Sequence, residues 1–321
     1  MTTLQPPLIG IPESPVPPDV SADWVVGAGG ARLRVALFQP KGKPRGSVVI
    51  SPGRSETIEK YFELVCELQA RNFVVLVHDW RGQGLSERIL SDPLKGHAVG
   101  FQDFVTDYRA ILDHFEAQLP GPWIAMAHSM GGCLTLIALA QGQADRFVGA
   151  FMSAPMLGLQ TPGRPKPGVR ALAWVMSRYR GDDYILGNPG TPMGGPFEGN
   201  ILTHDRVRYD RNLAPLKACP DLALGSGTWS WLEFAFTASR WLKSSPAVTK
   251  LKLPVVVLSA AQEALVDNDD QRQIVARIPL GRWRSIDGAF HELFQETDAV
   301  RAQVWAELDP LLDQWAPGSA G

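Results

Sequence analysis

The chain alternates between short apolar runs and longer stretches with helical periodicity. Apolar runs of strand length occupy residues 46–53, 73–80, 123–128, 147–155 and 253–260. Segments with a helical pattern lie between them, at residues 57–71, 101–119 and 130–141. Near-continuous apolar strands separated by helices are typical of a parallel sheet that helices cover on both faces. An alternating segment around a glycine-rich turn, residues 24–40, predicts an antiparallel hairpin ahead of this sheet.

This alternation stops after Pro155 and resumes at the apolar run 253–260. We therefore predict an α/β fold with a mostly parallel sheet, helices on both faces, and a helical cap inserted after the sixth strand. The predicted core comprises residues 21–156 and 250–316, and the predicted cap comprises residues 157–249. Residues 1–20 are rich in proline, which predicts an extended N-terminal arm.

Composition narrows the class of protein. The 321 residues include 31 basic and 33 acidic side chains, so the net charge of −2 gives no reason to expect a nucleic-acid partner. The three cysteines form no CxxC pair, and we predict neither a metal site nor a cofactor. The N-terminal segment lacks the pattern of a secretory signal, and no apolar run approaches the ~18 residues of a membrane span. We therefore expect a cytoplasmic protein.

A single serine stands where a strand-like run meets a helix-like run, in the segment WIAMAHSMGGCLTLIALA at 123–140. At such a turn the hydroxyl of Ser129 projects above the sheet, beside a helix N-terminus whose free N–H groups favour negative charge. The turn is tight, and Ala127, Gly131 and Gly132 provide the small side chains that it needs. The string AHSMG is the G-x-S-x-G motif with alanine at its first position. We predict that Ser129 is a catalytic nucleophile.

A serine nucleophile needs a base, and His291 is the candidate. When a serine occupies this turn of a parallel sheet, its partners follow in the order serine, acid, histidine. Of the six histidines only His291 follows the resumed strands, in the loop DGAFHELFQE. The acid is expected in the loop AQEALVDNDD, where Glu263 and Asp267 could each orient the imidazole. Asp267 is alternatively the cap of a helix that starts near Asn268.

Ester or amide hydrolysis also requires donors for the oxyanion of the tetrahedral intermediate. The N–H of Met130, at the start of the helix after the nucleophile, is one predicted donor. The loop SPGRSETIEKY, which follows the first parallel strand, supplies the other. In this loop Gly53 permits close approach of the substrate to the backbone, and Arg54 offers its N–H.

Four motifs in sequence order, SPGRSETIEKY, HDWRGQGLSE, AHSMGG and GAFHELFQE, resemble the α/β-hydrolase superfamily. Within it, they resemble the group of bacterial lysophospholipases and monoacylglycerol lipases, over about residues 45–300. The resemblance implies a nucleophile at Ser129, a catalytic histidine at His291 and an oxyanion loop at Arg54. It also aligns Glu263 with the position of the acid, which is usually an aspartate in this group.

Two segments of the predicted cap differ in composition from the core. Residues 161–180 carry five cations and no acid. Their apolar residues follow the spacing of one helix face, at Val169, Leu172, Ala173 and Met176. A basic amphipathic helix of this kind could meet an anionic lipid surface, and it is equally typical of an ordinary cap helix.

The second segment, TWSWLEFAFTASRWLK at 228–243, is dense in aromatic residues. Aromatic side chains often line apolar ligand pockets. We predict that Trp229, Trp231 and Phe234 contact the acyl chain of a substrate.

These features together predict a serine carboxylester hydrolase that cleaves a single-chain lipid ester, a lysophospholipid or a monoacylglycerol, through an acyl-enzyme at Ser129. Peripheral contact with the inner membrane through the basic cap segment is part of this hypothesis. An aminopeptidase-like enzyme, or another small ester or amide hydrolase, is one alternative, because the cap contains Asp182, Asp183 and Glu198. A non-catalytic binding protein of the same fold is the other.

Overall fold

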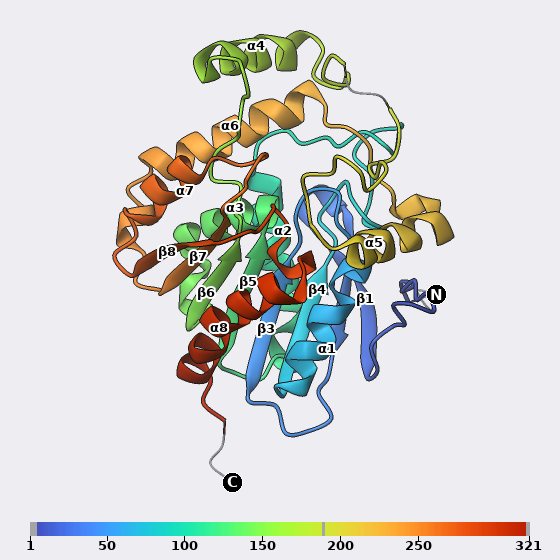
Figure 1. Ribbon diagram of the computed structural model, residues 1–321, viewed down its shortest axis with the longest axis vertical. Helices are drawn as coiled ribbons and strands as arrows, with labels where there is room; N and C mark the ends of the chain where they lie inside the picture. The colour runs from blue at the N-terminus through green and yellow to red at the C-terminus, as the bar shows by residue number, and fades with distance from the viewer. Residues whose placement is uncertain (1–4, 188–189, 319–321) are drawn as a thin grey trace.

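The computed structural model describes residues 5–187 and 190–318, which form one sheet of eight strands flanked by helices (Figure 1). The strands lie in the order β1-β2-β4-β3-β5-β6-β7-β8. β1 and β4 pair antiparallel with β2, and the remaining neighbours pair in parallel. The strands are β1 Val20–Val26, β2 Arg32–Phe38, β3 Gly46–Ser51, β4 Phe73–His78, β5 Trp123–His128, β6 Gly149–Ser153, β7 Val255–Ala260 and β8 Gly281–Ile286.

Helices connect the parallel strands and cover both faces of the sheet. The α-helices are α1 Phe62–Ala70, α2 Gln102–Phe115, α3 Ser129–Ala138, α4 Lys166–Tyr179, α5 Arg206–Ala218, α6 Trp229–Ser244, α7 Asn268–Val275 and α8 Asp298–Trp315. In β3, Val48 and Ile50 pack in the apolar cluster that contains α1 and α8, and Val49 packs in the cluster that contains α2 and α3. Because both faces of the central strands β3 to β7 are buried, these strands are mostly apolar along their whole length. The predicted fold class is confirmed.

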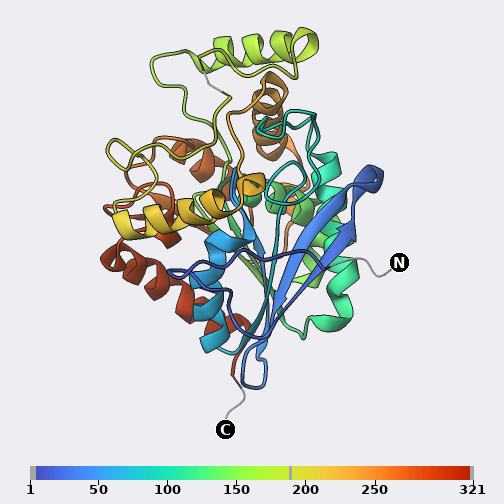
Figure 2. The ribbon, with the colours of Figure 1, turned by 90° about the vertical axis from the view of Figure 1, so that its right-hand side faces the viewer.

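The chain between β6 and β7, the sixth and seventh strands, carries α4, α5 and α6. Figures 1 and 2 show α4 at the top of the molecule, above α6 and away from the sheet. α6 is anchored to the core, since Phe234, Ala238 and Leu242 are fully buried in the same cluster as α2 and α3. The insertion therefore lies over the edge of the sheet where the parallel strands end.

The N-terminal arm is held by a buried ionic cluster beside β2. Arg34 is fully buried and forms ion pairs with Glu59 and Asp79, at 2.7 Å each. Its guanidinium also donates to the carbonyl of Pro7 at 2.9 Å, and the N–H of Ile9 donates to Glu59 at 3.2 Å. Part of the predicted arm, residues 1–4, lies outside the described residues. None of the helices in the described ranges is long and apolar enough to cross a bilayer.

Candidate active site

Ser129 lies at the turn between β5 and α3, where the backbone is strained. Its φ of 49° is in the left-handed region, which a non-glycine residue seldom adopts without a structural reason. The turn also brings backbones into close approach, because a side chain at Gly131 would collide with the carbonyl oxygens of Ser51 and Pro52. At Gly132 a side chain would collide with Pro155. The predicted need for small residues around the serine therefore has a clear physical basis.

Ser129, His291 and Glu263 form a chain of hydrogen bonds. Nε2 of His291 lies 2.9 Å from Oγ of Ser129, and Nδ1 of His291 lies 2.7 Å from Oε2 of Glu263. The side chains of His291 and Glu263 are only 4% and 1% exposed, so water does not compete for these contacts. Ser129 comes from the β5–α3 turn, Glu263 from the loop after β7, and His291 from the loop after β8.

Glu263 is fixed by its own loop. Its Oε1 accepts hydrogen bonds from the N–H groups of Ala264 and Leu265, at 3.0 and 2.8 Å. Burial alone would raise the pKa of this carboxyl, but the hydrogen bonds from His291 and the loop hold the pKa below its usual value. Glu263 is therefore ionised at neutral pH and places its negative charge against the ring of His291.

Asp267, the alternative acid, has another role. Its side chain accepts hydrogen bonds from the N–H groups of Asp269 and Asp270, which makes it the N-cap of α7. Its second oxygen pairs with Lys166 of α4. Asp267 therefore caps α7 and connects α4 to the core through Lys166. Glu263 is the acid that contacts His291.

The predicted oxyanion residues lie beside Ser129. Met130 follows the serine in the first turn of α3, where N–H groups have no acceptor within the helix. In the loop after β3, the N–H of Gly53 donates to Glu56, and the N–H of Ser55 donates to Gln83 at 3.1 Å. Side chains thus occupy the N–H groups on both sides of Arg54. Gly53 and Arg54 both line the cavity that contains Ser129 and His291.

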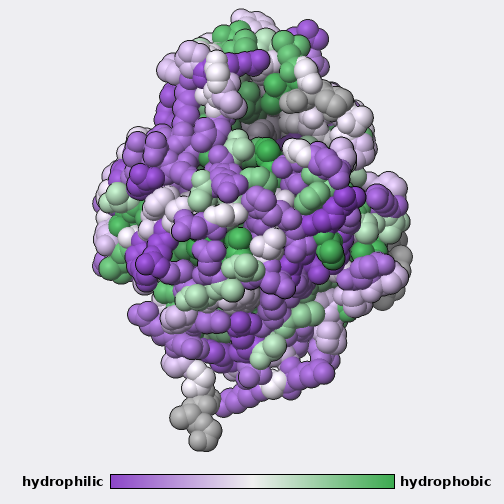
Figure 3. All heavy atoms as spheres, in the orientation of Figure 1, coloured by the Kyte–Doolittle hydropathy of each residue, from purple (hydrophilic) through white to green (hydrophobic). Residues whose placement is uncertain are grey.

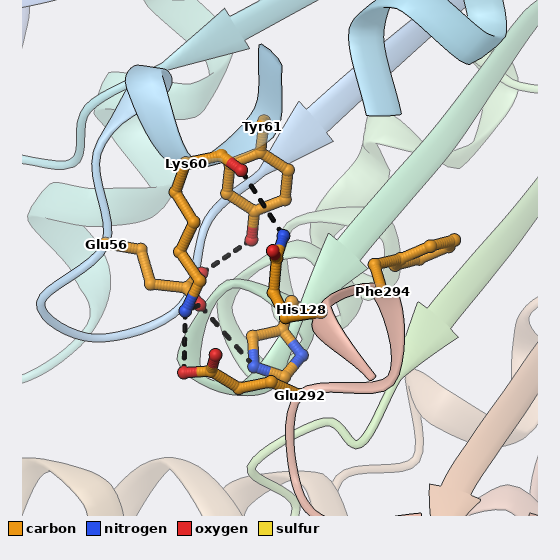
Figure 4. A pocket seen from close by; sticks show the side chains of 7 residues that line it. Glu56, Lys60, Tyr61, His128, Glu292 and Phe294 are labelled. Carbon is orange, nitrogen blue, oxygen red and sulfur yellow. Dashed lines mark hydrogen bonds and ion pairs between the residues drawn. The ribbon is translucent and has the colours of Figure 1, made fainter. Parts of the chain in front are cut away.

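Behind this loop lies a buried charged cluster that the sequence analysis did not identify (Figure 4). Nζ of Lys60 lies 2.7 Å from Glu56 and 2.6 Å from Glu292. The hydroxyl of Tyr61 donates to Glu56 at 2.5 Å. Burial alone would raise the pKa of Glu56, but the cation of Lys60, the ring of His128 and the hydrogen bond from Tyr61 together outweigh burial and hold the pKa at about 2. The spacing of four residues between Glu56 and Lys60 could have indicated their ion pair from the sequence. The contact of Lys60 with Glu292 could not be predicted in this way, because it depends on the tertiary structure.

His128 lies between this cluster and the candidate base. Its ring centroid is 4.8 Å from that of His291, and its Nε2 is 3.7 Å from Glu56. Nδ1 lies 3.0 Å from the carbonyl oxygen of Ser153, which requires a proton on Nδ1. Burial lowers the pKa of His128 to about 4, so the ring is neutral at pH 7 and adds no positive charge next to His291.

One cavity opens next to Ser129, and a second cavity adjoins it. The first has a volume of ≈ 270 Å³, and its lining includes Ser129, His291 and the apolar side chains of Met156, Leu159 and Val266. The second, of ≈ 450 Å³, lies between the loop after β3 and α5. Both cavities share a boundary that is lined by Ser55, Glu56, Met193, Leu202, Leu265 and Glu292.

The three predicted aromatic contacts differ in their placement. Trp231 lines the first cavity. Phe234 is fully buried and stacks on Phe104 with ring centroids 5.6 Å apart, and Trp229 is 4% exposed at the start of α6. Phe234 thus belongs to the packing between α6 and the core. The expected substrate contact of Phe234 and Trp229 finds no support in the lining of either cavity.

The sheet order, the serine at the turn after β5 and the loops that follow β7 and β8 define the α/β-hydrolase fold. The chain belongs to the family described as serine aminopeptidase, S33, whose model matches residues 42–298. The resemblance to the α/β-hydrolase superfamily, and to its group of lysophospholipases and monoacylglycerol lipases, is confirmed.

Individual relatives support this placement. Lysophospholipase L2 of Escherichia coli strain K12 is 36% identical over 269 residues, which cover 79% of this chain and 76% of that protein. Monoglyceride lipase of Rattus norvegicus is 24% identical over 292 residues, covering 89% and 88%. Among solved structures, a soluble variant of monoglyceride lipase from Saccharomyces cerevisiae superposes with a TM-score of 0.75 at 19% identity, covering 98% of this chain and 99% of that one.

Proposed function

We propose that this protein is a serine hydrolase that cleaves the carboxylic ester of a single-chain lipid, a lysophospholipid or a monoacylglycerol. The observation that carries this proposal is the hydrogen-bonded chain Ser129, His291 and Glu263 at the wall of an apolar cavity. The names of the relatives, a lysophospholipase and a monoglyceride lipase, support the substrate class.

In the proposed mechanism, Oγ of Ser129 attacks the ester carbonyl while Nε2 of His291 accepts the hydroxyl proton. The imidazolium then gives this proton to the leaving alcohol, and an acyl-enzyme forms on Ser129. A water molecule, deprotonated by His291, releases the fatty acid and restores the serine. Glu263 keeps the ring oriented and stabilises its positive charge during both steps.

The oxyanion donors in this mechanism are the N–H groups of Met130 and Arg54. The N–H of Met130 is available because the first N–H groups of α3 have no acceptor within the helix. In the facing loop, Glu56 and Gln83 occupy the neighbouring N–H groups, which leaves that of Arg54 for the substrate.

The apolar part of the cavity wall favours an acyl chain. Met156, Leu159 and Val266 line the space next to Ser129, and the second cavity extends it past Leu202 toward Leu213 of α5. Burying methylene groups against such walls stabilises the complex by ~0.8 kcal/mol for each group. We assign residues 157–249 the role of a cap that closes over this chain.

We also propose that α4 contacts an anionic lipid surface. Leu172, Trp174, Val175 and Tyr179 are 48%, 51%, 41% and 83% exposed, respectively. Figure 3 shows apolar groups at the top of the molecule, where α4 lies, among hydrophilic side chains. Of the four residues predicted to share one helix face, Ala173 is buried, Val169 and Met176 are half-buried, and Leu172 is exposed. Leu172, Val175 and Tyr179 follow the i, i+3, i+7 spacing of one helix face. This exposed strip on a basic helix suits a membrane interface.

An aminopeptidase-like activity is the second candidate, because the family description names such enzymes. A peptidase of this type needs an acidic group that is free to bind the substrate amine. In the cap, Asp183 pairs with Arg180 and Glu198 pairs with Arg206, while Asp182 is 70% exposed. Asp183 and Glu198 are thus occupied, and Asp182 is not among the residues that line the two cavities, which favours the ester hydrolase.

The test compares fatty-acid release from lysophosphatidylcholine, monoacylglycerol and short-chain aryl esters with hydrolysis of aminoacyl amides. The Ser129→Ala protein is the blank. We expect serine-dependent release from at least one long-chain lipid. Turnover of aminoacyl amides without lipid hydrolysis would establish the second candidate, and failure of a fluorophosphonate to label Ser129 would point to a non-catalytic protein.

A further inference from the structure

Arg54 places a cation in the wall of the candidate active-site cavity. Its Nη2 donates to the carbonyl oxygen of Gly225 at 2.6 Å, and its Nη1 lies 3.9 Å from the sulfur of Met193. The guanidinium also lies over the ring of Trp231, 4.8 Å from the ring centroid. Its Nε is buried and has no hydrogen-bond partner among the described residues.

No carboxylate of the described residues forms an ion pair with Arg54. The contrast with Arg34 is direct, because that buried guanidinium pairs with both Glu59 and Asp79. A charge removed from water without a counter-ion is costly. Burial accordingly lowers the pKa of Arg54 to about 10, and no neighbouring acid offsets this effect. Arg54 remains cationic at neutral pH and lacks an anion.

The position of Arg54 indicates where an anion would come from. It lines the same cavity as Ser129 and His291, and Met193, next to its Nη1, lies at the boundary with the second cavity. A neutral monoacylglycerol offers no anion to this site. In a lysophospholipid, the glycerol unit links the scissile ester to a phosphodiester, so a bound molecule carries a negative charge close to its reacting carbonyl. Guanidinium is well suited to phosphate, because its planar N–H groups can donate two parallel hydrogen bonds.

We infer that the guanidinium of Arg54 binds the phosphate of a lysophospholipid head group and makes the enzyme prefer lysophospholipids to monoacylglycerols. This inference rests on the proposed ester hydrolase function and names its substrate more narrowly. In this arrangement the backbone N–H of Arg54 donates to the oxyanion, and its guanidinium binds the phosphate of the head group. Head-group binding and positioning of the reacting carbonyl are thus linked through one residue.

The test compares lysophosphatidylcholine and monoacylglycerol with the same short acyl chain, both as monomers in solution. We expect Arg54→Met to lower the ratio of kcat/KM for the two substrates by about tenfold or more, the effect of losing a charge-assisted hydrogen bond. Arg54→Lys should retain part of this ratio. A loss of activity that affects both substrates equally, through a disturbed oxyanion loop or a smaller fraction of folded protein, does not change this ratio.

Arg88→Met is the matched control. Arg88 also ties the core to the cap, by donating to the carbonyl oxygens of Asp221 and Ala223 at 2.7 and 3.1 Å, but it is not among the residues that line the two cavities. Its replacement should leave the ratio unchanged. If Arg54→Met and Arg88→Met both leave the ratio unchanged, Arg54 only connects the core to the cap, and the inference is wrong.

A second readout separates a head-group site from a site for free anions. Glycerophosphocholine should inhibit hydrolysis of a short aryl ester by the wild-type protein. We expect the same compound to inhibit Arg54→Met about tenfold more weakly. Inhibition by inorganic phosphate alone, with no effect of glycerophosphocholine, would overturn the head-group assignment. This readout needs no lipid turnover, so it tests Arg54 even if the proposed lipid hydrolysis fails.

Discussion

Oγ of Ser129 lies 2.9 Å from Nε2 of His291, although 162 positions separate the two residues in the chain. Ser129 follows β5 and His291 follows β8, with β6 and β7 between these strands in the sheet. Since the strands from β3 to β8 are parallel, their carboxyl ends lie along one edge. Loops that leave this edge can therefore bring distant residues into contact.

Replacement of either member of this pair should abolish turnover. We expect Ser129→Ala and His291→Ala each to lower kcat for the preferred ester by ~10⁴- to 10⁶-fold, because Ser129 carries the acyl group and His291 takes part in every proton transfer of the proposed mechanism. Steady-state fatty-acid release is the measurement, and an unchanged thermal unfolding curve is the control. Residual activity within tenfold of the wild-type value would contradict these roles.

The two candidate acids can be separated by isosteric variants. Glu263→Gln should lower kcat by roughly 10²- to 10⁴-fold, because His291 loses its charged partner. Asp267→Asn should leave kcat near the wild-type value and lower the free energy of unfolding by no more than ~1 kcal/mol, because asparagine caps a helix as well as aspartate does and only the pair with Lys166 is lost. Kinetic assays and urea unfolding of both proteins give the comparison. The reverse pattern would assign the acid to Asp267.

The close packing of the serine turn predicts intolerance at Gly131. Gly131→Ala should lower the free energy of unfolding by about 2 kcal/mol or more, because the new methyl group would collide with the carbonyl oxygens of Ser51 and Pro52. Gly168→Ala in α4 is the matched control, since its new methyl group would point into open space and alanine favours the helix. Equal stability of the two variants in urea would refute the packing argument.

The cluster around Glu56 predicts a specific pH dependence of stability. The pKa of Glu56, about 2 in the folded protein, lies below the ordinary value of 4.5, because Lys60 and the other neighbouring groups outweigh the effect of burial. The carboxylate therefore stabilises the fold above about pH 4.5, and this contribution is lost as the pH falls toward 2. Glu56→Gln should be less stable than the wild-type protein at pH 7, with a difference that shrinks as the pH falls.

Urea unfolding between pH 7 and pH 3 measures this difference. The exposed residue Glu116 provides a control, because Glu116→Gln should cost little stability at any pH. A difference between Glu56→Gln and the wild-type protein that is constant with pH would mean that the charge of Glu56 does not contribute.

The exposed strip on α4 predicts a defect at lipid surfaces. A Leu172→Ser, Val175→Ser double variant should bind vesicles that contain phosphatidylglycerol several-fold more weakly, because two apolar contacts with the bilayer are lost. Its kcat/KM for a monomeric short-chain ester should stay unchanged. Val207→Ser, at a 74% exposed site on α5, is the control. Equal vesicle binding by all three proteins in a sedimentation assay would exclude α4 as the contact.

The sequence predicted the regular parts of the molecule well. The apolar runs correspond to β3 to β7, and each predicted boundary lies within a few residues of the observed one. The predicted helix at 57–71 begins with a 3₁₀ turn at residues 58–61 before α1. Strand and helix periodicities depend on local geometry, which is why they can be read from neighbouring residues.

Composition was less informative in the insertion between β6 and β7. Trp231 and Phe234 stand in one aromatic segment, yet Trp231 lines the cavity and Phe234 is buried against Phe104. Residues three apart lie on neighbouring parts of one helix face, and the core surface beneath α6 decides which of them is covered. The outward position of Leu172 on α4 has the same origin.

The sequence by itself determined the strand and helix alternation, the serine turn and the order of Ser129, the acid loop and His291, because these depend on short-range spacing. Only the tertiary structure decided that Glu263 contacts His291, that Asp267 caps α7, and that Lys60 lies between Glu56 and Glu292. The physical reason is that these contacts join loops whose relative positions are set by the packing of the whole sheet.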